Sequence, residues 1–119
     1  MHELSICQAL INQLETLASE QHAKRVLSLV VGVGPLSGVD AHLLKQAYPV
    51  AAAGTLAEDS ELDIENRPVR VHCRTCGDDS DATANRLLCA HCGDWRTDLL
   101  SGDELILTRV EFEREQAYV

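Results

Sequence analysis

The sequence predicts an α+β protein, because three stretches alternate apolar and polar residues as strands do and two others follow a helical period. The expected order along the 119 residues is helix, strand, helix, strand, a cysteine-rich insert and a last strand. Only 3% of the residues are aromatic, so the core has to be built from Leu, Val, Ile and Ala. A chain of this length is about one domain long.

Two stretches predict helices. From residue 3 to 20, apolar side chains recur at helical spacing and polar ones fall largely opposite, which indicates an amphipathic helix. Its apolar face holds Ile6, Leu10, Leu14 and Leu17. A second helix is expected over 39–47. Pro49 should end or kink it, because proline lacks an amide donor, and Tyr48 before it is biased away from helical dihedral angles.

Three stretches predict strands, at 25–33, 61–67 and 104–113. The first, RVLSLVVGV, is rich in the β-branched residues that strands favour, and the turn residues GPLSG follow it. The other two alternate apolar residues with acids, which predicts strands with one solvated face. In the first strand Leu27, Leu29, Val31 and Val33 alternate along one face, with Val26 and Val30 on the other. Leu62 and Ile64 are expected to point inward in the second strand, and Ile106, Val110 and Phe112 share one face of the third.

The net charge of −9 bears on the partners of the protein. Nucleic acids and anionic membranes are bound by basic surfaces, so both are disfavoured as partners. No apolar run approaches the roughly 20 residues that span a bilayer, and no basic segment followed by an apolar run marks a signal peptide. We therefore expect a cytoplasmic protein.

The insert carries two CxxC pairs, Cys73-Arg-Thr-Cys76 and Cys89-Ala-His-Cys92, separated by twelve residues. Two such pairs predict a tetrahedral zinc ion with four thiolate ligands. Because no coordination position remains open, this zinc would be structural. The region 69–101 holds few large apolar residues, so the metal would replace the core that it lacks.

Other interpretations of the cysteines are weaker. The spacing could be accidental, or the pairs could be redox dithiols, but neither pair begins a helix after a strand. His72 and His91 lie beside the cysteines, and we expect them to support the ligands from outside or to face solvent. Cys7 is expected to be a buried free thiol. His22 and His42 are expected on the surface.

The chain begins Met1-His2-Glu3. The α-amine of Met1, the amide nitrogens of His2 and Glu3 and one imidazole nitrogen can reach a common plane. Four nitrogens in a plane suit Ni(II) or Cu(II), and the Glu3 carboxylate could add an axial contact or orient His2. The large side chain of His2 should protect Met1 from removal. An ordinary N-terminus is the alternative, and these residues alone do not decide between the two.

The blocks MHELSICQAL, GVGPLSGVD, GTLAEDSELDIE, the two CxxC pairs and SGDELILTRVEFE together resemble the HypA/HybF family of hydrogenase nickel-incorporation proteins. The resemblance covers essentially the full length and keeps the order of the blocks. It implies a small three-stranded sheet with two helices on one face, plus an inserted zinc-ribbon lobe. It also implies a nickel-binding domain, 1–68 with 102–119, and a zinc-binding domain, 69–101.

The resemblance further implies a nickel metallochaperone that acts with a HypB-type GTPase. It would deliver Ni(II) to the large-subunit precursor of [NiFe]-hydrogenase, and urease maturation factors are a further class of partner. Met1, His2 and Glu3 would form the nickel site, and the four cysteines of the insert would hold structural Zn(II). We expect a monomer or a weak homodimer.

Two other classes of function are weighed against the metallochaperone. The main alternative is an acidic zinc-ribbon scaffold that binds proteins and carries no transferable metal. An enzyme is disfavoured, because the serines and histidines stand in no recognisable nucleophile–base motif.

Overall fold

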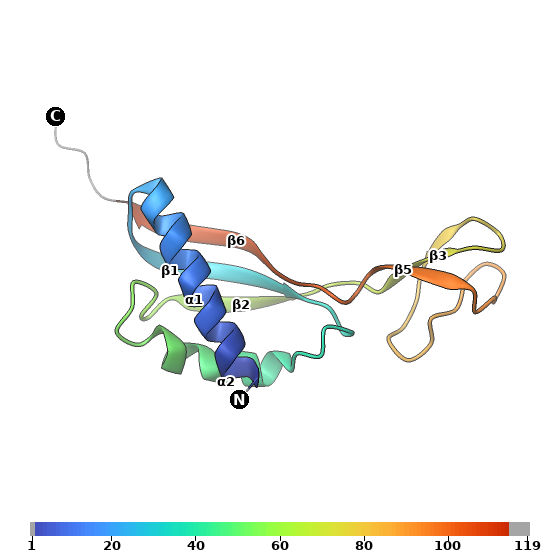
Figure 1. The fold of residues 1–119 in the computed structure, drawn as a ribbon, viewed down its shortest axis with the longest axis horizontal. Helices are drawn as coiled ribbons and strands as arrows, with labels where there is room; N and C mark the ends of the chain where they lie inside the picture. Colours follow the sequence, from blue (N-terminus) through green and yellow to red (C-terminus); the bar gives the residue numbers. More distant parts are fainter. Residues whose placement is uncertain (1, 115–119) are drawn as a thin grey trace. The chain divides into compact units, whose positions relative to one another are not determined.

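The computed structural model describes residues 2–114, which separate into two compact units. The first unit holds residues 2–31, 40–64 and 107–114, and the second holds 32–39 and 65–106. The helices and strands are α1 (His2–Gln21), β1 (Ala23–Val33), α2 (Ala41–Ala52), β2 (Glu61–Asn66), β3 (Arg70–Cys73), β4 (Asp79–Asp81), β5 (Thr97–Ser101) and β6 (Leu105–Arg114) (Figure 1). One sheet has the strand order β2-β1-β6 and the other β4-β3-β5.

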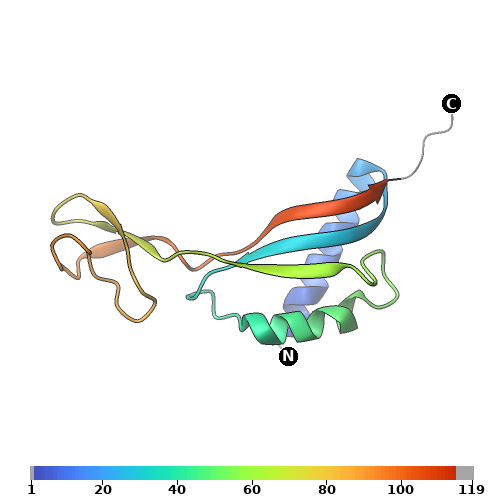
Figure 2. The same ribbon diagram turned by 180° about the vertical axis from the view of Figure 1, so that it is seen from behind.

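The core of the first unit lies where α1 meets α2 and the β2-β1-β6 sheet. The apolar face of α1 buries Cys7, Leu10, Ile11, Leu14 and Ala18. Leu44, Tyr48 and Ala52 are buried from α2. Both helices lie on one face of the sheet, with α1 in front of it in Figure 1 and behind it in Figure 2. The predicted fold class is therefore confirmed. Neither α1 nor α2 is long and apolar enough to cross a membrane.

Side chains on β1 and β6 show that these two strands run antiparallel. Ser28 Oγ donates to Glu111 Oε2 at 3.2 Å, and Thr108 Oγ1 donates to the carbonyl oxygen of Val30 at 3.1 Å. From the first contact to the second, the residue number rises on β1 and falls on β6, as it does in an antiparallel pair. The last strand of the sequence thus pairs beside the first.

Pro49 does not end the second helix, because α2 continues through this residue to Ala52. Proline removes one helical hydrogen bond, which costs about 3 kcal/mol in a helix interior. Packing of the last turn offsets that cost. Tyr48 is buried and its hydroxyl lies 2.7 Å from Ser60 Oγ, while Ala52 is buried beyond the proline. The amide of Ala53 donates to the carbonyl of Pro49 at 3.1 Å and closes the helix.

Two further features depart from the sequence prediction. Leu27 is 38% exposed whereas its neighbour Val26 is buried, so the expected alternation breaks before Leu29.

The predicted outline also lacked β3, β4 and β5, which build a small antiparallel sheet inside the cysteine insert. These strands are three to five residues long, which is too short for a clear alternation of apolar and polar residues.

The core position of Leu14 predicts a large cost of truncation. Leu14→Ala should lower the free energy of unfolding of the first unit by about 2–5 kcal/mol, because the fully buried side chain leaves a cavity. Leu43 is 46% exposed, so Leu43→Ala should change the free energy of unfolding by no more than about 0.5 kcal/mol. Urea denaturation followed by the helical circular dichroism signal measures both. Equal losses would contradict this assignment of the core.

Candidate metal centres

Both CxxC pairs fold into the same tight turn. The amide of Gly77 donates to the carbonyl of Cys73 at 3.0 Å, and the amide of Gly93 donates to that of Cys89 at 2.9 Å. The two glycines have φ of 81° and 78°, a region that residues with a β-carbon rarely adopt. Each glycine therefore closes a tight turn, and the two cysteine sulfurs of that turn can point toward the same place.

Backbone amides within these turns point at the first sulfur of each pair. Cys76 N–H donates to Cys73 Sγ at 3.4 Å, and Cys92 N–H donates to Cys89 Sγ at 3.5 Å. These bonds are the main reason that the pKa of the Cys73 thiol falls below its usual value and that of Cys89 falls to about 6. The turns thus favour the thiolate form, which is the form that binds metal.

The second sulfur of the first pair behaves differently. A hydrogen bond from the Asp78 amide favours the thiolate of Cys76, but desolvation and the neighbouring sulfurs outweigh it and raise the pKa of Cys76 to about 12. Four thiolates cannot gather at one point unless a cation balances their charge. A bound cation would relieve this repulsion and let all four sulfurs ionise together.

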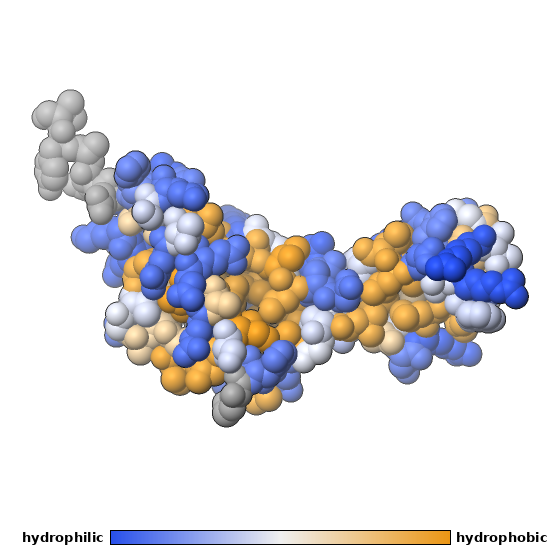
Figure 3. Space-filling view, viewed as in Figure 1, coloured by the Kyte–Doolittle hydropathy of each residue, from blue (hydrophilic) through white to orange (hydrophobic). Residues whose placement is uncertain are grey.

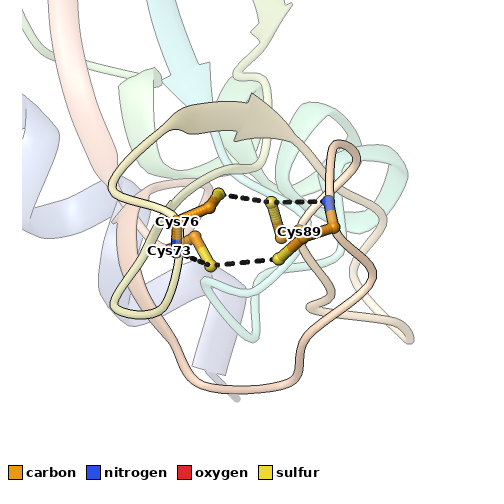
Figure 4. A group of neighbouring side chains, drawn as sticks. Cys73, Cys76 and Cys89 are labelled. Carbon is orange, nitrogen blue, oxygen red and sulfur yellow. Dashed lines mark hydrogen bonds between the residues drawn. The ribbon is translucent and has the colours of Figure 1, made fainter.

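The four sulfur atoms converge, with each within 4.8 Å of the others. The closest contacts are 3.6 Å, between Cys73 and Cys92 and between Cys76 and Cys89, and Figure 4 shows the labelled thiols turned toward one another. Zinc–sulfur bonds of about 2.3 Å in a tetrahedron would place sulfurs about 3.8 Å apart. The cluster that was predicted from the spacing thus fits a structural zinc ion.

Hydrogen bonds outside the cluster hold the two turns together. Thr75 Oγ1 in the first turn donates to Asp94 Oδ2 beyond the second at 2.6 Å. Ser80, buried on β4, accepts a bond from the Ala90 amide at 3.0 Å. The short sheet therefore positions the second pair of cysteines directly, and sequence reasoning had no signal for Ser80.

The histidines near the cluster are not among its converging groups. His72 Nδ1 lies 2.6 Å from Asp79 Oδ1 on the neighbouring strand. His91 is exposed, and its backbone amide donates to Cys89 Sγ at 3.4 Å. Cys7, by contrast, is confirmed as a buried free thiol in α1.

The predicted nickel ligands lie at the start of α1. His2 has a side chain that is 64% exposed, while that of Glu3 is only 15% exposed. The two are adjacent, with 3.4 Å between His2 Nδ1 and Glu3 Oε2. Both belong to the first turn of the helix, where amide groups have no intrahelical carbonyl partner. Met1, the third predicted ligand, lies outside the described residues.

Glu3 also joins the starts of the two helices. Its Oε2 accepts a bond from the Asp40 amide at 3.5 Å, and Asp40 is the residue that caps α2. Burial disfavours ionisation of Glu3, but hydrogen bonds from its own amide, from His2 and from Asp40 outweigh burial and lower its pKa. Sequence reasoning missed Asp40, although an aspartate before a helical stretch is a recognisable cap.

Known proteins resemble this chain over nearly its whole length. A family model described as "Hydrogenase/urease nickel incorporation, metallochaperone, hypA" matches residues 1–112. A hydrogenase maturation factor HypA from Nitrosospira multiformis is 50% identical over 93% of this chain and 96% of its own length. One from Aquifex aeolicus is 40% identical over 95% and 98%. The solution structure of the Ni metallochaperone HypA from Helicobacter pylori superposes with a TM-score of 0.71 at 26% identity, covering 95% of this chain and 98% of that one.

Removal of one cluster cysteine should abolish zinc binding. We expect purified Cys76→Ser protein to lose its stoichiometric zinc, because three thiolates and a solvent-accessible gap hold the ion far more weakly than four. The matched control is Cys7→Ala, which removes a thiol outside the cluster and should keep one zinc per chain. Elemental analysis after dialysis against a chelator measures both. Zinc retained by Cys76→Ser, or lost from Cys7→Ala, would contradict the assignment.

Proposed function

The chain belongs to the HypA family of hydrogenase and urease nickel-incorporation metallochaperones, and we propose that it binds Ni(II) at its N-terminus and delivers it to the large-subunit precursor of [NiFe]-hydrogenase with a GTPase partner. The observation that supports the proposal most is the exposed His2 beside the anchored carboxylate of Glu3. Both lie in the first turn of α1.

The ligands proposed for nickel are the α-amine of Met1, the amide nitrogens of His2 and Glu3, and one imidazole nitrogen of His2. The Glu3 carboxylate would add an axial contact or orient His2. Planar nitrogen donors suit Ni(II) rather than the tetrahedral Zn(II). A site on the surface holds its ion with few surrounding groups, so a partner can reach the ion and replace the ligands. A metallochaperone needs this exposure, because an enclosed ion cannot be handed on.

The four cysteines have the opposite role in the proposal. Cys73 and Cys89 are buried and Cys76 and Cys92 are exposed, and four thiolate ligands would leave no coordination position open for exchange. Zinc held there would supply a rigid crosslink for the second unit, which has few apolar residues of its own. We further propose a cytoplasmic protein, monomeric or a weak homodimer, that can also serve urease maturation factors.

Replacing His2 should remove most of the nickel affinity. In calorimetric titrations of protein with its native N-terminus, His2→Ala should weaken binding about tenfold or more, because one ligand side chain is lost. His22→Ala is the matched control, since His22 is also exposed but stands at the end of α1.

Equal nickel binding by wild-type and His2→Ala protein would favour a zinc-ribbon scaffold without transferable metal. A tag at the N-terminus, which blocks the α-amine, should also weaken binding more than a tag at the C-terminus. Equal weakening by the two tags would exclude the amine as a ligand.

Nickel affinity should fall on mild acidification while zinc stays bound. Model imidazoles and α-amines lose their protons near pH 6.5 and about 8, and both must do so to bind metal. Glu3 has a lowered pKa, so it stays ionised throughout this range and does not contribute to the fall. Titrations between about pH 6 and pH 8 measure the change, and an unchanged affinity would exclude nitrogen ligands of this kind.

A further inference from the structure

Each CxxC pair forms one turn with the glycine after it, and we call 73–77 the first cysteine turn and 89–93 the second. Their backbones follow one pattern. The amide of Cys73 donates to the carbonyl of Asp78 at 2.9 Å, and the amide of Cys89 donates to that of Asp94 at 3.0 Å. Because the two turns are alike internally, a difference in how firmly they hold a metal ion is expected to come from their attachment to the rest of the second unit.

The first cysteine turn is attached to the sheet through its backbone. Cys73 is the last residue of β3, the central strand of the β4-β3-β5 sheet, and it pairs with Thr97 of β5. The amide of Arg74 donates to the carbonyl of Arg96 at 2.9 Å. β4 then begins at Asp79. A change of one side chain leaves these backbone bonds in place.

The second cysteine turn is attached differently, because it lies in the connection between the end of β4 at Asp81 and the start of β5 at Thr97. Ala90 follows the first cysteine of this turn, as Arg74 does in the other. Its amide donates to Ser80 Oγ at 3.0 Å. A side-chain hydroxyl thus accepts the bond that a backbone carbonyl accepts in the first turn. The attachment of the second turn therefore depends on the identity of residue 80.

Hydrophobic packing contributes little to holding the second cysteine turn. Leu87 and Trp95, on either side of it in the sequence, are 36% and 71% exposed, and Figure 3 shows hydrophobic residues at the surface of the second unit. The bond from Thr75 to Asp94 also reaches this region, but it is exposed, so water competes for both groups. The partly buried bond to Ser80 is better shielded from such competition.

Ser80 occupies a position at which a strand residue is expected to be apolar. It is 6% exposed in the middle of β4, and it pairs with the fully buried Val71 of β3. A buried hydroxyl gives up hydrogen bonds to water, and the loss is offset only when it finds a partner in the protein. Alanine or valine would serve packing at this position, so the hydroxyl is best explained by its bond to the second cysteine turn.

The bond to Ser80 acts directly beside a metal ligand. Ala90 follows Cys89 in the chain, so the bond fixes the backbone next to that sulfur. The closest sulfur contacts, at 3.6 Å, join one cysteine turn to the other. A shift of the second turn therefore changes the spacing of the whole cluster. Groups that orient metal ligands from outside change metal affinity by about 10–100-fold when they are removed.

We propose that Ser80 is a positioning residue of the cysteine cluster, whose hydroxyl holds the second cysteine turn against the sheet. The first turn is the fixed half of the metal site. The second is the half that opens, so Cys89 and Cys92 separate first from a bound zinc ion when the hydroxyl is lost. The proposal rests on the fit of the cluster to zinc and is independent of nickel delivery.

Ser80→Val and Ser80→Thr test the hydroxyl at nearly constant size, because both new side chains are branched at the β-carbon. We expect Ser80→Val to transfer its zinc to a chromophoric chelator about tenfold faster than the wild-type protein does. Ser80→Thr should keep a rate close to that of the wild type. Ser80→Ala, which cannot overfill the site, should behave as Ser80→Val does. Equal rates for all three variants, or a wild-type protein without bound zinc, would overturn the proposal.

Alkylation of the thiols during zinc transfer shows which turn opens first. Cys76 and Cys92 are both exposed, so exposure alone would let them react alike. In Ser80→Val, mass spectrometry of peptides should find the cysteines of the second turn alkylated before those of the first. Earlier reaction of the first turn, or simultaneous reaction of both, would contradict the assigned roles.

A matched control loosens the sheet and keeps the hydroxyl. Val71 is fully buried and lies opposite Ser80 in the pairing of β3 with β4. Val71→Ala removes apolar contacts from this sheet, so it should speed alkylation of both cysteine turns without a preference. A preference for the second turn in Val71→Ala as well would show that any loss of stability opens it, and the role of Ser80 would be wrong.

Discussion

The convergence of four sulfur atoms is the constraint on which the second unit depends. Its apolar side chains are few, and two of its buried residues, Cys73 and Cys89, are themselves members of the cluster. Short strands and tight turns of this kind cannot hold a fold through burial alone. The glycines, the amide–sulfur bonds and the Thr75–Asp94 contact all act to bring the thiols together, and a metal ion would complete the crosslink.

The two candidate metal centres differ in how their residues are held. The cysteines lie in closed turns, and hydrogen bonds from several segments support them. The N-terminal residues have one exposed imidazole and one anchored carboxylate. The cysteine cluster suits a metal ion that stays bound, and the N-terminal residues suit a metal ion that is passed on. The proposed function follows from this contrast.

Much of the fold followed from the sequence, because long elements carry strong periodicity. The first helix and the three strands of the larger sheet appeared near their expected positions, and the CxxC spacing predicted the thiol cluster. The sequence did not predict that α2 continues beyond Pro49. Local preference stops a helix at proline, whereas burial of Tyr48 and Ala52 against the rest of the first unit sustains it.

By itself, the sequence determined the chemical groups: four thiols in two pairs, a histidine and a glutamate behind the first methionine, and an acidic surface. Only the tertiary structure decided which distant residues meet them. Asp40 reaches Glu3 across 37 positions, and Leu4 meets Leu43 and Val50 around one groove. Spacing along the chain reports neighbours within one turn or strand, whereas contacts between elements depend on packing, which no local pattern encodes.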